Sequence, residues 1–288
     1  MKITKFYFVT LTVIFLIFTN ITFSQGWSNL YNVKSGAFWE INYGNSVSNS
    51  IKDLKSEFNN IGSIELRLGY IKNFEEDNFY VAYKVPYFFT YNNNTLSASK
   101  NDVGKVNSTL ISFGQHSIQT GLGFGGRKFR IIFYSPILAS SLSWAKLTID
   151  SFPSQIDSSE KIIYKDFGEQ IRYGAIREGG ISIDFGKLRS TRFGINLGYE
   201  SQIIYPRHLF WKDLLSQAIE GCGSVGILGL AGLIAESSPE ASVIFNFVLQ
   251  NALSFGFQYL RKEKMNWPFD TTKPLSIDRF KIGFYVAF

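Results

Sequence analysis

Cysteine and histidine are nearly absent from the 288-residue chain, which contains one cysteine and two histidines. Cys222 has no partner for an intramolecular disulfide, so no disulfide framework supports the fold. Signals for a metal site or a cofactor are lacking too. The glycine-rich run 121–126 enters a predicted hairpin and begins no helix, so it does not match a nucleotide-binding loop. The sequence therefore predicts neither a metal nor a cofactor.

Long apolar runs and strong charge are also scarce. After the N-terminal region, the best candidate for a membrane-spanning helix is 225–235, which is rich in glycine and about half of the roughly 20 residues required. The formal net charge is only +6 at pH 7, and the basic residues form no clustered stripe. We therefore expect neither a helical membrane span nor nucleic acid as a partner.

Aromatic residues, by contrast, are abundant: they make up 17% of the chain, with 28 phenylalanines and 15 tyrosines. In a soluble protein so many aromatic side chains need a large core. On the surface of a membrane β-barrel they face lipid or form girdles at the two interfaces. The composition favours the second arrangement.

The first 24 residues have the pattern of a secretory signal peptide. Lys2 and Lys5 precede a short apolar core at 6–18, and the small residues Thr22 and Ser24 stand three and one positions before the expected cleavage point. An N-terminal membrane anchor is the alternative, but it needs about 20 apolar residues, and this core is shorter and interrupted. Residues 25–288 are then expected to form a single domain.

Much of the remaining chain alternates between apolar and polar residues, the period that places them on opposite faces of a strand. The predicted strands are 37–44, 64–70, 79–91, 106–124, 129–138, 171–185, 192–205, 242–249, 253–260 and 276–288. Segment 242–249 also fits a helix, and eight strands are then expected in place of ten. Pro86 predicts a bulge or break in its strand, and a change of parity near Gly114 predicts a β-bulge.

The final strand carries the most informative pattern. One face reads Phe280, Ile282, Phe284, Val286 and Phe288, and the other includes Arg279 and Lys281. This resembles the last strand of Gram-negative outer-membrane β-barrels, which ends in an aromatic residue and is read by the barrel assembly machinery. The long and short connections between predicted strands also alternate as in such barrels.

The resemblance implies an all-β fold, a transmembrane antiparallel up-and-down β-barrel of about ten strands within a range of roughly 8 to 12. It implies an outer-membrane location, with outer-membrane lipids and the assembly machinery as partners. The last strand is expected to close the barrel against 37–44. A secreted soluble β-sandwich is the alternative, and it would be extracted without detergent.

The period changes in the segment 206–250, where apolar residues recur at helical spacing and polar residues such as Lys212 and Glu220 fall opposite them. We expect a helical insert in one outer loop, which buries its own apolar face. Other placements left open are the membrane surface, the mouth of the barrel and the lumen.

Charged residues of both signs occupy the polar face of the predicted strands. They are Glu40, Glu65, Arg67, Lys84, Arg130, Asp184, Arg192, Glu200, Arg279 and Lys281. Their burial is tolerable only if they are paired, and barrels near eight strands are just wide enough for side chains. We therefore expect a paired polar network that fills the lumen, in which Arg279 and Lys281 meet carboxylates such as Glu40.

These patterns predict a non-enzymatic barrel: a scaffold, a surface-interaction protein or a narrow transport pore, with a small solute or an extracellular partner. The alternative is an outer-leaflet lipid-modifying enzyme built on His116, with 206–250 as its lid. Adjacent residues of a strand face opposite sides, so Ser117 and His116 do not meet without a bulge. His208 is expected at a helix start or an interface.

Overall fold

The computed structural model describes residues 34–51, 54–76, 79–100, 102–125, 129–137, 141–168, 170–186 and 191–288; the predicted signal peptide lies outside them. These residues form ten antiparallel strands, three α-helices and one 3-10 helix. The strands are β1 (Lys34–Ile51), β2 (Gly62–Glu76), β3 (Phe79–Asn93), β4 (Asn107–Gln115), β5 (Ile118–Gly125), β6 (Phe129–Ile137), β7 (Leu142–Ser151), β8 (Ile171–Phe185), β9 (Arg192–Ile204) and β10 (Leu275–Ala287). The helices are η1 (Asn94–Leu96), α2 (Ser158–Gly168), α3 (Phe210–Ala235) and α4 (Pro239–Glu263).

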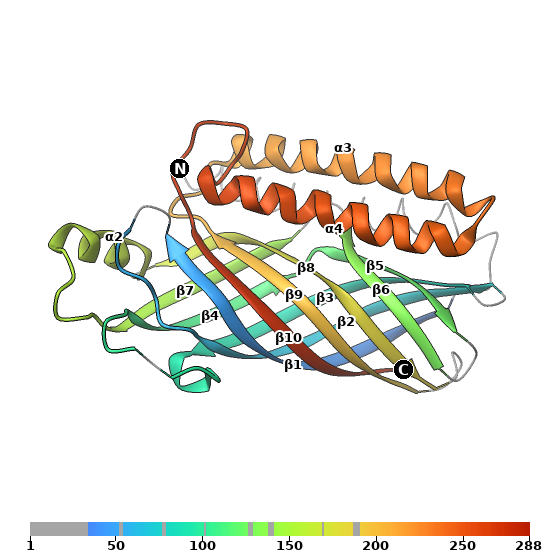
Figure 1. Cartoon of the computed structure of the whole chain (residues 1–288), viewed down its shortest axis with the longest axis horizontal. Coiled ribbons are helices and arrows are strands. Elements are labelled where there is room, and N and C mark those ends of the chain that lie inside the picture. The colour runs from blue at the N-terminus through green and yellow to red at the C-terminus, as the bar shows by residue number, and fades with distance from the viewer. Residues whose placement is uncertain are drawn as a thin grey trace, which may run out of the picture.

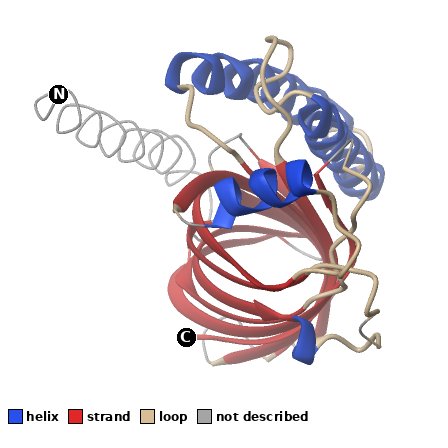
Figure 2. Cartoon of the chain, turned by 90° about the vertical axis from the view of Figure 1, so that its left-hand side faces the viewer, coloured by secondary structure: helices blue, strands red, loops and turns tan. Residues whose placement is uncertain are grey.

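All ten strands belong to one sheet, in the order β2-β1-β10-β9-β8-β6-β5-β3-β4-β7. Two further pairings, β2 with β3 and β8 with β7, bring the sheet back onto itself, so each described strand has a neighbour on both sides. Figure 2 shows the resulting ring of strands end on. The predicted closing pair is confirmed, since β10 runs antiparallel to β1 from Phe38 opposite Ala287 to Ile51 opposite Leu275.

The ten strands occupy eight positions around this ring. β5 and β4 pair with successive parts of β3, and β6 and β7 pair with successive parts of β8. The predicted strand 106–124 is therefore interrupted, and the interruption falls at His116 and Ser117 rather than as a bulge at Gly114. β4 and β5 thus share one position of the ring, and β6 and β7 share another.

Pro86 explains where the first interruption falls. The backbone N–H of His116 donates to the Pro86 carbonyl at 2.9 Å, but proline has no N–H to return to a neighbouring strand. β3 itself runs straight through Pro86, which lies opposite Gly69 of β2. The break expected at Pro86 thus occurs in the strand beside it.

The second half of the chain differs from the predicted strands in two places. Segment 242–249 takes the helical alternative and lies in α4, together with 253–260, which was predicted as a strand; the interval 139–170, for which no strand was predicted, contains β7 and α2. Apolar and polar residues alternate locally in α4, but over its whole length buried polar residues recur every four positions, the spacing of a helix face. They are Ser242, Asn246, Gln250, Ser254 and Gln258. Ser238 caps this helix by accepting from the Ala241 N–H at 3.3 Å, with Pro239 in the first turn.

The enclosed interior is layered along β10. Ile277 belongs to an apolar cluster at one end, which also contains Leu110, Leu147 and Tyr164 of α2. Arg279 and Lys281 follow in a charged middle layer, and Tyr285 joins a second apolar cluster with Phe38, Ile71 and Ile132. Side chains therefore pack the interior on both sides of the charged layer.

The helical insert is confirmed, but it is longer than 206–250 and lies elsewhere than expected. α3 and α4 pack against each other and run along the outside of the sheet (Figures 1 and 2). α4 makes most of the contact with the sheet, over β5, β6, β8 and β9. The helices thus cover part of the outer wall and leave the interior to the strands.

Candidate functional site

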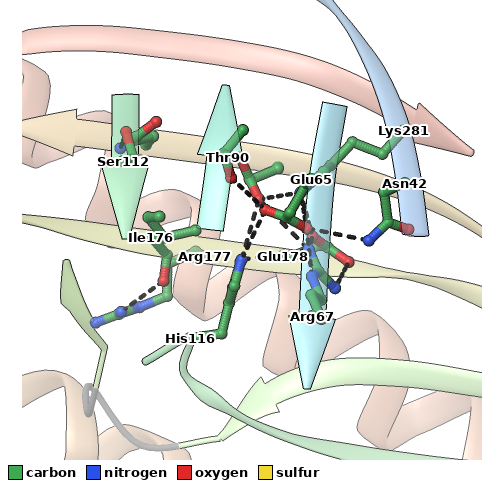
Figure 3. A network of polar contacts seen from close by, with 12 residues as sticks. Asn42, Glu65, Arg67, Thr90, Ser112, His116, Ile176, Arg177, Glu178 and Lys281 are labelled. Carbon is green, nitrogen blue, oxygen red and sulfur yellow. Dashed lines mark hydrogen bonds and ion pairs between the residues drawn. The ribbon is translucent and has the colours of Figure 1, made fainter. Parts of the chain in front are cut away.

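The structure buries all ten charged residues that strand alternation placed on the polar face, with relative exposures from 0% for Glu65 to 8% for Lys84. They do not form one network. Six of the ten lie in a central cluster, Lys84 lies against aromatic rings apart from it, and Arg130, Asp184 and Arg192 form a separate group near the end of β8. His116 also belongs to the central cluster (Figure 3).

Arg67 on β2 is the centre of the cluster. Its guanidinium donates to Glu178 of β8 at 2.9 Å and to Glu40 of β1 at 3.2 Å, and it also pairs with Glu65, two residues earlier on β2. One of its terminal nitrogens lies 3.6 Å from Glu200 of β9. A single buried cation thus contacts four carboxylates from four strands.

Lys281 on β10 is the second cation of the cluster. Its Nζ lies 2.5 Å from Glu200, 2.8 Å from Glu65 and 3.2 Å from Glu178. Asn42 donates to the same Glu65 carboxylate at 3.1 Å, and Thr90 at 2.9 Å. Buried carboxylates are therefore compensated by both charge and hydrogen bonds, as low-polarity surroundings require.

Arg279 extends the cluster toward the first apolar layer. Its Nε lies 3.0 Å from Glu200, and its terminal nitrogens donate to Asn92 and Gln202. The described carboxylate partners of Arg279 and Lys281 are thus Glu65, Glu178 and Glu200, whereas Glu40, the carboxylate named in the prediction, is bound by Arg67. Both cations point inward and bind Glu200 of the adjacent strand β9, and Lys281 also reaches Glu65 of β2 and Glu178 of β8, which are not neighbours of β10.

His116 enters the cluster because it lies between two half-strands. Its Nε2 is 3.2 Å from Glu200, 3.2 Å from the Arg67 guanidinium and 3.7 Å from Glu65, and its ring packs edge-on against Phe88. Strict alternation would place adjacent residues on opposite sides. His116 and Ser117 are nonetheless both fully buried, since neither belongs to a strand.

A divalent metal ion is the obvious ligand to consider for this cluster. Ligand atoms of Glu65, His116, Glu178 and Glu200 lie within 4.8 Å of one another. However, the Lys281 ammonium already binds three of these four residues, all three carboxylates, at 2.5 to 3.2 Å. The chain therefore supplies its own cation where a metal ion would have to bind.

The remaining predicted interior residues lie apart from this cluster. The Lys84 ammonium is 4.1 Å from the ring centre of Tyr285 and 5.6 Å from that of Phe38. Arg130 donates to the Gly186 carbonyl at 3.3 Å, and Arg192 lies 3.7 Å from Asp184. Both arrangements stabilise the interior and leave no group poised for chemistry.

Sequence reasoning missed Glu178, although it lies in a predicted strand. Gly179 and Gly180 follow it and blur the alternation, but Glu178, Ser182 and Asp184 share one parity and all are buried. That parity was the available signal. Its neighbour Arg177, of the opposite parity, leads to a second cluster that the sequence did not predict.

This second cluster lies outside the sheet, beneath the helices. Arg177 of β8 forms a bidentate pair with Glu220 of α3 at 2.9 and 3.0 Å, and Arg261 of α4 binds the same carboxylate at 2.6 Å. Arg261 also contacts Ser216, and Arg177 donates to Ser141 at 2.7 Å. One glutamate thus holds both helices against the strand.

The other predicted residues are placed as follows. His208 precedes α3 by two residues and packs edge-on against Tyr173, in keeping with the expected position at a helix start. Phe280, Ile282, Phe284 and Phe288 are exposed, but Val286 is buried. Val286 lies directly between Trp39 and Phe193 in the register, and such cross-strand aromatic neighbours cover a smaller side chain.

A search with protein-family models finds no match to this chain, and a search of curated protein sequences finds none either.

Proposed function

We propose that the chain is an integral membrane β-barrel, carried to the outer membrane of a Gram-negative cell envelope, where it serves as a filled, non-enzymatic scaffold. The ring of strand pairings and the outward apolar surface support the barrel. The packed interior supports the scaffold over a pore. The pattern of the last strand supports assembly by the barrel machinery.

The observation that carries the proposal is the inverted distribution of polarity. Large apolar side chains are exposed along the outer face of many strands, including Ile41, Leu66, Leu68, Phe89, Ile195, Leu197, Ile282 and Phe284. Arginine, lysine, glutamate and histidine are buried inside. In water this arrangement is unfavourable, because apolar side chains stay exposed to solvent. In a bilayer each exposed apolar residue contacts hydrocarbon.

Backbone hydrogen bonding agrees with a bilayer environment. Each described strand has a neighbour on both sides, so none of them is an edge strand, which hydrocarbon would not tolerate. Eight positions around the ring match the size at which side chains alone fill a barrel. A soluble sandwich has two open sheets and therefore fits the pairings less well.

The interior favours a scaffold over a transport pore. Two apolar clusters flank the charged layer, and the charged side chains bind one another. An ion that entered would have to displace Lys281 or Arg67 from several carboxylates. Recognition would then fall to the long connections that gather with α2 at one end, as loops on a rigid frame commonly do.

The geometry does not favour a lipid-modifying enzyme at His116. That side chain is 0% exposed, and its Nε2 is engaged by Glu200 and Arg67. The helices proposed as a lid run along the outside of the wall, whereas His116 contacts Glu200 and Glu65 in the interior. A lipid at the outer surface would not reach the imidazole.

The proposal is tested by membrane extraction and by conductance. Cells expressing the full chain are washed with alkaline carbonate, and the purified protein is incorporated into planar bilayers. We expect the protein to stay in the membrane fraction until detergent is added, and the bilayer current to stay at baseline across voltages and salts. Release without detergent would contradict the barrel, and a steady current would contradict the filled scaffold.

A further inference from the structure

The helix pair α3 and α4 has its polarity reversed relative to the helices of a soluble protein. The expectation that the insert buries its apolar face was wrong: α3 exposes Leu214, Leu215 and Ile219 and buries Asp213, Ser216 and Glu220. Burial normally follows the hydrophobic effect, which keeps the apolar face of a helix out of water. The reversal indicates that the exposed side of the pair does not meet water.

The exposed side is apolar along nearly the whole length of both helices. On α3 from 214 to 235 the exposed residues are Leu214, Leu215, Ala218, Ile219, Cys222, Val225, Gly226, Gly229, Leu230, Gly232 and Leu233. On α4 from 241 to 260 they are Ala241, Ile244, Val248, Ala252, Gly256 and Tyr259. Neither set contains a charged residue or an amide.

The buried side is polar and donates hydrogen bonds to the other helix and to the wall. Ser224 donates to Gln250 at 2.7 Å, Ser242 to the Ala231 carbonyl at 2.7 Å, and Gln258 to the Ser201 carbonyl of β9 at 3.0 Å. Glu220 joins Arg177 and Arg261. These bonds hold the helices together and against the strands, beside aromatic contacts of Phe247 with Phe133 and of Phe255 with Tyr199.

The helices also lie over a break in the wall. β6 and β7 are separate segments, and among the described residues β8 pairs with them only through 171–174 and 180–185. Across the interval on β8, Ser141 accepts from the Ile176 N–H at 2.9 Å, and Asn251 of α4 packs so closely that a Cβ on Gly179 would lie 1.8 Å from its Oδ1. Because hydrocarbon cannot satisfy backbone groups at such a break, a polar helix face over it is what a bilayer requires.

The length of α3 matches the thickness of a bilayer. Its 26 residues extend about 39 Å at a rise of roughly 1.5 Å per residue, and the hydrocarbon core is about 30 Å thick. By length and composition α3 qualifies as a membrane span, which corrects the expectation drawn from 225–235 alone. Charged residues flank the pair at both ends, with Lys212 and Lys264 at one and Glu236 and Glu240 at the other.

We infer that α3 and α4 form a transmembrane hairpin in the same bilayer as the strands, with acyl chains against its exposed face. The inference rests on the proposed membrane barrel and extends it. The apolar outer wall continues from the strands onto the helices, and the polar face seals the break between β6 and β7. The molecule then combines a strand barrel and a helical hairpin within one membrane-embedded surface.

Cys222, the single cysteine of the chain, is a natural probe because it lies on the exposed side near the middle of α3. The full chain is labelled there with bimane in detergent and incorporated into phosphatidylcholine vesicles. Quenching is then compared for lipids brominated at the middle of the acyl chain and for aqueous iodide. We expect strong quenching by the brominated lipid and little by iodide.

Two matched variants in a Cys222→Ser background calibrate the result. Leu68→Cys reports the outer wall of β2, far in sequence from the helices, and Val103→Cys reports a loop residue that is 94% exposed. The inference requires Cys222 to behave like the label at position 68. If Cys222 is quenched by iodide, or by neither quencher, while position 68 is quenched by the lipid, the transmembrane hairpin is wrong and the barrel stands. If position 68 is itself quenched by iodide, the barrel fails.

Discussion

Two buried ionic clusters lie on opposite sides of the same strand. Glu178 of β8 points inward to Arg67 and Lys281, and the preceding residue, Arg177, points outward to Glu220 and Arg261. The inner cluster joins strands that are also linked by backbone hydrogen bonds. The outer cluster joins a strand to two helices, which side chains largely hold in place.

This difference predicts different consequences when the clusters are broken. Removing one partner from a buried ion pair costs about 3 to 5 kcal/mol, because the remaining charge is left uncompensated. In the inner cluster the loss should appear in the unfolding of the whole sheet. In the outer cluster it should appear first as release of the helices, with the sheet intact.

The largest effect is expected for Arg67→Met. Arg67 contacts four carboxylates, so its removal leaves them with only Lys281 and Arg279 nearby. We expect the free energy of unfolding in lipid vesicles to fall by at least about 3 kcal/mol, measured by urea titration. Arg67→Lys is the matched control and should retain part of that stability. A loss below about 1 kcal/mol would show that the inner cluster does not depend on Arg67 for its stability.

The next effect is expected for Glu220→Gln, which leaves Arg177 and Arg261 buried without a carboxylate. We expect the helix pair to detach while the sheet remains folded. The measurement is trypsin cleavage near Arg261 and Lys262, which should become fast, compared with the migration of unheated protein on denaturing gels, which should not change. If cleavage becomes fast and the unheated protein also loses its folded migration on the gel, the outer cluster belongs to the same folding unit as the inner one.

Replacing all three outer residues sharpens the comparison. Arg177→Met, Glu220→Leu and Arg261→Met together remove every charge of the outer cluster, and such apolar replacements of buried ion triads are often neutral or stabilising. We expect the helices to stay attached, so trypsin cleavage should be as slow as in the unaltered protein. Fast cleavage of the triple variant would mean that the charges are required for docking in themselves.

His116→Ala should have a smaller effect. His116 contributes packing against Phe88 and contacts with Glu200 and Arg67, but those two residues are also paired with each other and with Lys281 or Glu178. We expect modest destabilisation and an unchanged membrane lipid profile in whole cells. A lipid profile that changes with this substitution, and is restored by the unaltered chain, would revive the enzyme alternative.

The smallest effect concerns α2, outside the strands. The Ser56 side chain and the backbone N–H groups of Lys55 and Ser56 hold the pKa of Glu160 below its usual value. A depressed carboxyl pKa stabilises the folded state above the unfolded pKa, about 4.3, and that contribution is lost as pH falls through the folded pKa. A spin label on Ile162→Cys in Cys222→Ser protein should gain mobility in acid.

In Glu160→Gln protein the same label should be equally mobile at neutral pH and in acid, because the substitution removes the titrating carboxylate. Identical, pH-independent mobility in both proteins would show that Glu160 does not attach α2 to the loop before β2.

Strand alternation alone located the buried charges, because successive strand residues must face opposite sides. It placed Glu65, Arg67 and Lys281 inside but could not choose their partners, since Lys281 reaches Glu65 and Glu178 on strands that are not its neighbours. It also missed Arg177 as a buried residue. A residue on the outward face of a strand is predicted to face lipid unless the helix that covers that residue is known.

The helices show the opposite limit. The repeat of Ser242, Asn246, Gln250, Ser254 and Gln258 is visible in the sequence, but a period of two fits the apolar residues between them over short windows. Helical spacing was recognised before residue 220, and there the choice of the buried face was wrong. That choice assumed water outside, whereas the proposed membrane hairpin would have hydrocarbon there.

The central claim is that lipid covers the outer face of this molecule while charge lies inside, and photolabelling of the unaltered protein tests it most directly. Vesicles contain a lipid with a diazirine at the end of one acyl chain, and carbene adducts are located by tandem mass spectrometry. On β3, adducts should appear at Tyr87, Phe89 and Tyr91, whose side chains are exposed, and not at Phe88 or Thr90, which are buried. Adducts without this period of two, or none on β3, would contradict the account.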